Sequence, residues 1–380
     1  MGMFRSTQIL LALSLALPIL AVDPASQRIS VHEWGTFTTV AGQDGNSMQW
    51  RPLNASDLPC FVERMALANP KGMFSTFVRM ETPVLYFYAQ RPARLSVRVD
   101  FPQGRITEWY PKASALFPAG LGSGAYDGRI EWNSVEVLPG ETPAFPTGKE
   151  TSHYYAARAT DAAPIRVNGQ KEKFLFYRGI GNFDIPVEAK FDAAGRLRVR
   201  NTGKAPLPVA IYLENRGGKI GYRMVRTLSG EVEWDAPELA GTASEVRREL
   251  ESELAKAGLF PKEAAAMVET WGDSWFEAGT RVFYIMPRPI VDAVLPLRME
   301  PEPAATERVF VGRVELLAPW RQAELLAATE ASQLVAVGRF LDPFIAQLAQ
   351  TNPNLTRSTA YRSAANQLYR IADQRIDCVQ

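Results

Sequence analysis

The chain has 380 residues, of which 46% are hydrophobic and 22% charged, a composition typical of a folded globular protein and not of a disordered one. Its 42 Lys and Arg residues nearly balance its 41 Asp and Glu residues. This neutrality excludes a nucleic-acid partner, because binding to phosphates requires a basic surface.

The first twenty-one residues have the layout of a secretory signal peptide. Arg5 precedes an uncharged run, Ile9 to Leu20, and the small residue Ala21 follows. The run is too short for a bilayer core, which needs roughly 20 apolar residues. We therefore expect an exported protein, periplasmic or extracellular, with no transmembrane span in the mature chain.

Strand patterns fill the region from Ile29 to about Val225. Runs of aromatic and β-branched residues alternate with Gly and Pro, which punctuate strands. The expected strands cover residues 30–40, 84–89, 95–101, 105–110, 130–138 and 173–177, and two hairpins follow at 187–201 and 209–225. Many short strands at this spacing predict a sandwich of antiparallel sheets.

Helical signals begin at Pro237. Thr242 and Glu245 fit a capping box, Gly258 is expected to end the first helix, and a second is expected to begin around Pro261. Strand signals return at residues 281–286 and 308–316. Pro319 begins a long helical tail, in which we expect Pro343 to cause a kink or break.

These patterns together predict a mainly β fold with α elements: β-sandwich-like antiparallel sheets, a helical insertion and a helical C-terminal tail. The expected organisation is a signal peptide at 1–21, a β-sandwich-like assembly at 22–236 plus 279–318, a helical insertion at 237–278 and a C-terminal helical region at 319–380.

Cys60 and Cys378 are the two cysteines of the chain. An oxidising compartment favours a disulfide between them, which would tie the C-terminus to the N-terminal third. The alternative is two unrelated thiols, because spacing alone does not place both within reach of one another.

Charge is distributed unevenly along the chain. Residues 158–226 carry fourteen Lys and Arg against six Asp and Glu, whereas residues 231–277 carry four against twelve. One interpretation places the acidic helices beside the basic sheet, and another leaves both surfaces solvated. A third leaves the ridge of Arg196, Arg198 and Arg200 open to an anionic polymer.

The most distinctive string is VHEWGTFT at residues 31–38, and the segments RMETPVLYFY at 79–88 and KFLFYRG at 173–179 accompany it. In these segments the chain resembles a family of exported bacterial proteins that open with a HEWGTFT-type motif. The resemblance implies export and a shared fold. It implies no activity, so no functional residue is carried over from it.

Signatures of metal and cofactor chemistry are absent from the sequence. His32 and His153 are the two histidines, and no HExxH, CxxC, GxSxG, GxGxxG or P-loop pattern occurs. We therefore expect no metal site and no cofactor.

Glu precedes Trp four times, at residues 33–34, 108–109, 131–132 and 233–234. Strand alternation explains the pairs if Trp lies in the core and Glu in water. A sugar site explains them if Trp rings stack on a saccharide and carboxylates bind its hydroxyls. Within the first pair's strand, His32 and Glu33 point to opposite faces, whereas His32 and Trp34 share one.

Two functions remain open, and the sequence leaves undecided whether the protein is an enzyme. The leading hypothesis is an exported, non-catalytic binding or scaffolding protein with a polysaccharide or cell-envelope partner. The alternative is a carboxylate-dependent hydrolase acting on polysaccharide. Its candidate catalytic residues are Glu33, Glu81, Glu108 and Glu131, and the candidate binding residues are His32, Trp34, Arg79, Trp109 and Arg178.

Overall fold

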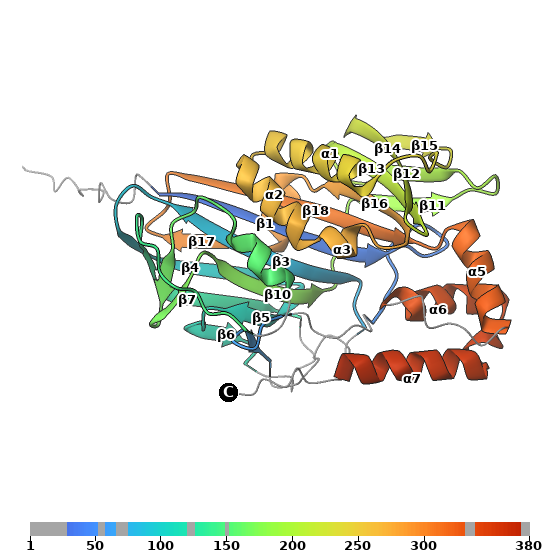
Figure 1. Cartoon of the computed structure of the whole chain (residues 1–380), viewed down its shortest axis with the longest axis horizontal. Coiled ribbons are helices and arrows are strands. Elements are labelled where there is room, and N and C mark those ends of the chain that lie inside the picture. Colours follow the sequence, from blue (N-terminus) through green and yellow to red (C-terminus); the bar gives the residue numbers. More distant parts are fainter. Residues whose placement is uncertain are drawn as a thin grey trace, which may run out of the picture.

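The structure is a computed structural model that describes residues 29–51, 58–65, 75–119, 126–148, 152–330 and 339–373. The predicted signal peptide and Cys378 lie outside these residues, so the leader and the Cys60–Cys378 disulfide stay predictions. The described chain is mainly β with several antiparallel sheets, as the sequence predicted (Figure 1). None of its helices combines the length and the apolar character needed to cross a bilayer.

The largest sheet has nine strands in the order β14-β13-β16-β18-β1-β3-β10-β5-β2. Its strands are β1 (Ser30–Val40), β2 (Glu63–Arg64), β3 (Val78–Tyr88), β5 (Gly104–Tyr110), β10 (Leu175–Gly181), β13 (Leu207–Arg216), β14 (Lys219–Leu228), β16 (Gly279–Ile285) and β18 (Ala305–Leu316). The central pair, β1 and β18, is parallel, and the other neighbours are antiparallel. The HEWGTFT-type motif therefore lies in the middle of this sheet.

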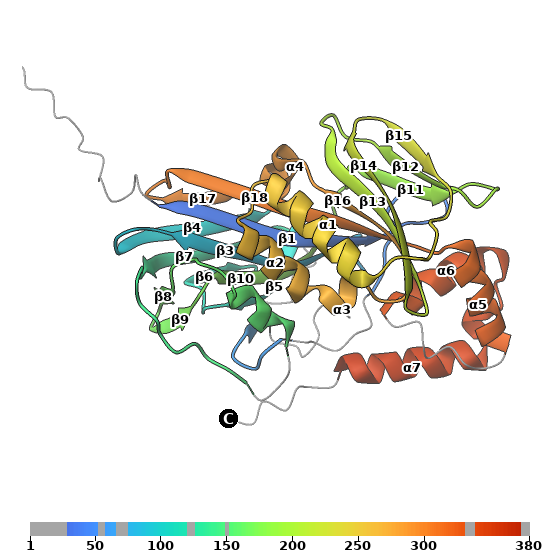
Figure 2. The same ribbon diagram turned by 45° about the horizontal axis from the view of Figure 1, so that its top comes forward.

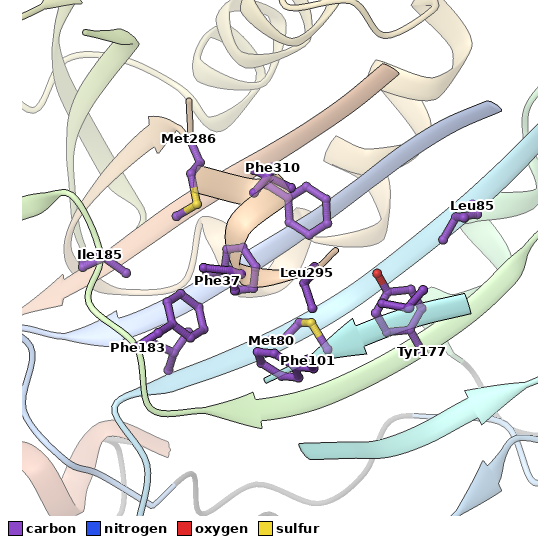
Figure 3. Close-up of a cluster of buried hydrophobic side chains, with 14 of the residues drawn as sticks. Phe37, Met80, Leu85, Phe101, Tyr177, Phe183, Ile185, Met286, Leu295 and Phe310 are labelled. Atoms are coloured by element: carbon purple, nitrogen blue, oxygen red, sulfur yellow. The ribbon is translucent and has the colours of Figure 1, made fainter. Parts of the chain in front are cut away.

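Two smaller sheets cover one face of the large sheet. One contains β17 (Leu297–Glu300), β4 (Ala93–Phe101), β7 (Gly128–Val137), β8 (Ile165–Val167) and β9 (Gln170–Glu172), with β6 (Ala115–Phe117) paired to β7. The other contains β11 (Val187–Phe191), β12 (Leu197–Asn201) and β15 (Glu231–Trp234). Buried side chains from all three sheets form one continuous apolar core, which includes Phe37, Met80, Phe101 and Phe310 (Figure 3).

Helices cover the opposite face of the large sheet. They are α1 (Ala243–Lys256), α2 (Pro261–Thr270) and α3 (Gly272–Trp275), and they lie across β1, β3 and β18 in Figure 1. Trp34, Tyr86 and Val311 of the sheet pack there in one core with Leu250 and Met267 of the helices. Because both faces are covered, the central strands are buried almost throughout.

Two short helices lie between strands: η3 (His153–Arg158), a 3₁₀ helix, and α4 (Arg288–Val294), which adds to the inter-sheet core. The remaining helices lie towards the C-terminus. α5 (Pro319–Glu330), α6 (Leu341–Thr351), η5 (Leu355–Arg357) and α7 (Thr359–Asp373) gather at one end of the molecule, around a third core that contains Trp50 and Phe344 (Figure 2).

Several local predictions are confirmed. The β11–β12 and β13–β14 hairpins pair as expected, and the Thr242–Glu245 capping box begins α1. One expectation is wrong. Pro343 lies in the first turn of α6, where a missing N–H removes no helical hydrogen bond, so it neither kinks nor breaks the helix.

Candidate functional site

Glu33 is buried in the apolar layer between the sheets, on the opposite face of β1 from His32, as predicted. Its carboxylate accepts hydrogen bonds from the Arg308 guanidinium and the Tyr177 hydroxyl. Arg308 also donates to Asp292 at 2.8 Å. Burial and the adjacent Glu33 charge raise the pKa of Tyr177 well above its ordinary value. Glu33 is therefore a partnered structural carboxylate and not an open catalytic one.

Glu81 lies on the helix-covered face, with a side chain that is 1% exposed. It accepts a hydrogen bond from the Thr38 hydroxyl at 2.7 Å and lies 2.9 Å from Arg79 and 3.1 Å from Arg339. Burial by itself raises the pKa of Glu81, but Arg79, Arg339 and the Thr38 hydrogen bond outweigh it and lower the pKa to about 2. The group is therefore ionised at any physiological pH and does not serve as a proton donor.

More ion pairs continue from Glu81 along the same face. Arg339 reaches Glu277 at 3.4 Å, Arg313 lies 2.7 Å from Glu277, and Arg281 donates to Glu315 at 2.6 Å. We call this set the buried ion-pair network; its members are Arg79, Glu81, Glu277, Arg281, Arg313, Glu315 and Arg339. Four guanidinium groups and three carboxylates alternate in it, so each buried charge has an opposite neighbour, as burial of charge requires.

The other candidate residues do not join one catalytic cleft. Glu108 is buried beside the Thr107 hydroxyl, opposite Arg178 in the β5–β10 register. Arg178 donates to the Thr82 hydroxyl at 3.0 Å, and its guanidinium lies 5.7 Å from the Trp271 ring centroid. Glu131 lies instead in the six-stranded sheet, beside Arg129 at 3.3 Å.

The Glu-Trp pairs follow strand alternation only in part. Trp34 and Trp132 are fully buried, and Trp109 packs against the inter-sheet core. The carboxylates of Glu131 and Glu233 reach solvent, but Glu33 and Glu108 do not. The difference arises because the nine-stranded sheet is covered on both faces at β1 and β5, so Glu33 and Glu108 have no face in water.

The basic ridge is neutralised by its own sheet. Arg196 contacts Asp192 at 2.7 Å, Arg198 contacts Glu233 at 2.5 Å, and Arg200 contacts Glu188. These acids lie on or directly after β11 and on β15, so strand neighbours, and not the acidic helices, face the ridge. Helix α1 meets the basic region at Arg226, which contacts Glu253 at 2.8 Å.

An open polar cavity lies at the other end of β1 and β3, with a volume of about 570 Å³. Its wall includes Tyr88, Gln90, Glu141, Thr160, Asp161 and Lys173, and we call it the lysine pocket. The turn at residues 139–141, the segment at 160–164 and the residues before β10 meet around it. These segments are distant in sequence, and none follows a periodic pattern.

Two polar groups of the lysine pocket lack partners within the part of the chain that the structure describes. The Lys173 ammonium has no ion pair there, and Asp161 of the same wall is engaged by Lys262 at 2.5 Å. Burial, together with the like charge of Lys262, lowers the pKa of Lys173. The Thr160 hydroxyl is buried and accepts or donates no hydrogen bond among these residues.

An exposed aromatic ring flanks the lysine pocket. Phe260 is 45% exposed, although His32 stacks on it at 4.4 Å and Tyr88 meets its edge at 4.9 Å. Glu263 fixes both neighbours, because its carboxylate lies 2.8 Å from His32 Nδ1 and accepts from the Tyr88 hydroxyl at 2.7 Å. Tyr88 also lines the lysine pocket, so Phe260 contacts a residue of the pocket wall without being part of that wall itself.

Of the predicted binding residues, His32 alone belongs to this site, as the support of Phe260. Sequence reasoning missed Lys173, Thr160, Asp161 and Phe260. The signal that could have drawn attention to Phe260 is its position directly before Pro261, where a helix begins and an apolar ring has no helical face to pack on.

Metal chemistry finds no support in the described residues, where no group of three His, Cys, Asp or Glu side chains could hold an ion. No protein-family model matches the chain, and no curated protein matches it in sequence. One solved structure, the yeast delta-COP-I mu-homology domain complexed with a Dsl1 WxWxV peptide, aligns with 78% of this chain and 100% of its own. Its TM-score of 0.28 and 7% identity carry no argument about fold or function.

Proposed function

We propose that the protein is an exported, non-catalytic binding protein whose lysine pocket holds a saccharide of the cell envelope. The observation that carries the proposal is the Phe260 ring, held between His32 and Tyr88 with 45% of its surface exposed beside a polar cavity. A single exposed apolar side chain is common on protein surfaces, but one held by two other rings next to a polar cavity gives a ligand a preformed apolar face.

The surroundings of Phe260 suit a sugar. One face of a sugar ring carries C–H groups that pack on an aromatic ring, while its hydroxyls need donors and acceptors around the edge. Gln90, Glu141, Thr160 and Asp161 supply both kinds of group. Because Phe260 is already fixed by two rings, little side-chain entropy is lost when a ligand stacks on it.

Catalysis is supported less well than binding. A glycosidase needs one carboxyl that holds a proton near neutral pH and a second carboxylate on the other side of the scissile bond. Neighbouring arginines lower the pKa of Glu81 to about 2, and they outweigh burial at Glu277 to lower its pKa too. The Glu33 side chain points into the layer between the sheets and is paired with Arg308, and Glu131 lies in the six-stranded sheet, so neither lines the lysine pocket.

The test is binding of the mature chain to soluble saccharides, measured by isothermal titration calorimetry. The probes are neutral glucans, chitin oligomers and oligouronates. We expect at least one probe to bind and the Phe260→Ala change to weaken it about tenfold, which corresponds to about 1.4 kcal/mol. Phe117→Ala is the matched control, because Phe117 is equally exposed but lies in the six-stranded sheet.

Binding that ignores Phe260→Ala, or the lack of binding to every probe, would overturn the proposal. Release of reducing ends from a bound probe would instead favour the hydrolase. Export has its own test: the N-terminus of the protein recovered from the envelope fraction should begin after residue 21 or close to it, and an intact leader on cytosolic protein would contradict export.

A further inference from the structure

We infer that the saccharide of the lysine pocket is anionic, and that Lys173 binds the carboxylate of a uronic acid unit. The inference rests on the proposed function and specifies its ligand. It follows from the charges that face the pocket and from a second polar group there that lacks a partner.

Lys173 is a half-buried cation without a counter-ion in the described residues. Its neighbour in sequence, Glu172, is turned inward, where it accepts from Arg158 at 2.6 Å and from the Tyr154 hydroxyl at 3.0 Å. Asp161 is held by Lys262 at 2.5 Å. Both nearby acids are therefore already matched, and the ammonium of Lys173 has lost part of its hydration without receiving an ion pair in return.

Glu141 is the other carboxylate of the wall, and it is exposed at the rim. A carboxylate in that position accepts hydrogen bonds from sugar hydroxyls, as water-exposed acids in binding sites commonly do. It does not substitute for a counter-ion of Lys173, with which it forms no ion pair in this structure. A ligand carboxylate supplies the missing negative charge.

Thr160 provides the independent observation. The residue is 8% exposed and lines the same cavity, and its hydroxyl has no hydrogen-bond partner among the described residues. Buried hydroxyls are nearly always hydrogen-bonded, so an unpartnered one beside a cavity is free to bond a group that occupies the cavity.

The size of the cavity agrees with this ligand class. Its volume of about 570 Å³ lies inside the range of small-ligand sites, which is about 300–1,000 Å³. Phe260 then takes the apolar face of a sugar ring, while Lys173 and Thr160 take its charged and hydroxyl groups. The three contacts together require a ring that carries both hydroxyls and an anionic substituent.

The experiment compares acidic oligosaccharides with their neutral methyl esters by calorimetry, using trigalacturonate and trimannuronate as the two uronate probes. The mature protein should bind at least one acid about tenfold more tightly than its ester. Lys173→Met should remove most of that preference, because it weakens binding of the acid far more than binding of the ester. Lys171→Met is the matched control, because Lys171 lies two residues away on β9, outside the pocket wall, and it should keep the preference.

Alkaline pH gives a second readout. The affinity for the acid should fall as Lys173 loses its proton, at a lower pH than for an ordinary lysine, because burial and Lys262 lower its pKa while Asp161 and Glu172 oppose them only in part. A neutral oligosaccharide, which unlike a methyl ester survives alkaline pH, should show no such fall.

The two proposals fail in different ways. If an ester or a neutral glucan binds as tightly as the acids, and the binding depends on Phe260, the inference is wrong and the proposed function stands. If neither uronate binds, the inference is also wrong. If Phe260→Ala changes no affinity, the proposed function itself is wrong. Thermal melting of each variant confirms that lost binding is not lost folding.

Discussion

The charged side chains at the two ends of β1 and β3 differ in their burial and in their ion pairing. At one end, Glu81 and its arginines are buried and mutually paired. At the other end, on the same helix-covered face, Lys173 is half-buried without an ion pair in the described chain, and Phe260 is exposed. The same pair of strands therefore supports a closed ionic core and an open cavity.

This comparison suggests a criterion for telling charged residues that stabilise the fold from those that bind a ligand, namely whether a desolvated charge is paired within the chain. A buried charge that is fully paired contributes to a unique fold but has no capacity left for a ligand. A desolvated charge without a partner is unfavourable for folding, so its presence indicates a partner outside the chain. By this criterion Glu33 and Glu81, which the strand patterns nominated as catalytic, belong to the fold, and the lysine pocket is the candidate binding site.

The largest expected effect is on the closed end. Glu81→Gln removes the carboxylate beside Arg79 and one of the two beside Arg339, and it should lower the free energy of unfolding by about 3–5 kcal/mol, measured by urea denaturation. Glu131→Gln is the control, because Glu131 also lies beside two arginines, Arg98 and Arg129, but reaches solvent. It should cost at most about 1 kcal/mol. Equal losses in the two variants would contradict a role for burial.

Acid should weaken the same network. The folded pKa of Glu81 is about 2, below its ordinary value of 4.5. A lowered folded pKa stabilises the protein above the unfolded pKa, and the contribution is lost as pH falls through the folded pKa. For Glu81 this is about 3 kcal/mol, lost between about pH 5 and pH 2. Urea titrations across that range should show the loss, with a shallower slope in Glu81→Gln; parallel slopes would refute the assignment.

Much of the fold could be predicted because its signals are local. Strand alternation, Gly-rich turns and the Thr242–Glu245 box depend on residues within a few positions of one another, and the structure confirms the hairpins and the first helix. The face assignment of His32 and Glu33 was predictable for the same reason, since neighbours on a strand diverge.

The site could not be predicted in the same way, because its contacts are not local. His32 and Glu263 are 231 positions apart, and Glu81 and Arg339 are 258 apart. Nothing in the spacing of Lys173, Thr160 and Glu141 indicates a shared cavity, which the loops between strands create. The sequence also gave no indication that Glu33 and Glu108 would be buried, because their partner residues come from other strands.

A smaller loss of stability is expected in the layer between the sheets, where Glu33 is also buried and paired. Tyr177→Phe removes one of the donors to the Glu33 carboxylate and should cost about 1.5–3 kcal/mol, the range for a hydrogen bond to a charged group. Tyr126→Phe is the control, since the Tyr126 hydroxyl makes an exposed contact with the Ser75 carbonyl at 3.4 Å. Its effect on urea unfolding should be close to zero, and a comparable loss there would remove the distinction.

The smallest expected effect on stability is at the lysine pocket, and the sign of that effect is what distinguishes the alternatives. Thr160→Val replaces a buried hydroxyl by a methyl group of nearly the same shape. If the hydroxyl had an internal partner, the change would cost about 1 kcal/mol; because it has none in the described chain, stability should stay within about 0.5 kcal/mol or rise. Urea unfolding of the unliganded protein measures this. The same variant should bind a uronate less tightly. Unchanged or higher stability together with lower affinity is the result expected for a hydroxyl whose partner is the ligand.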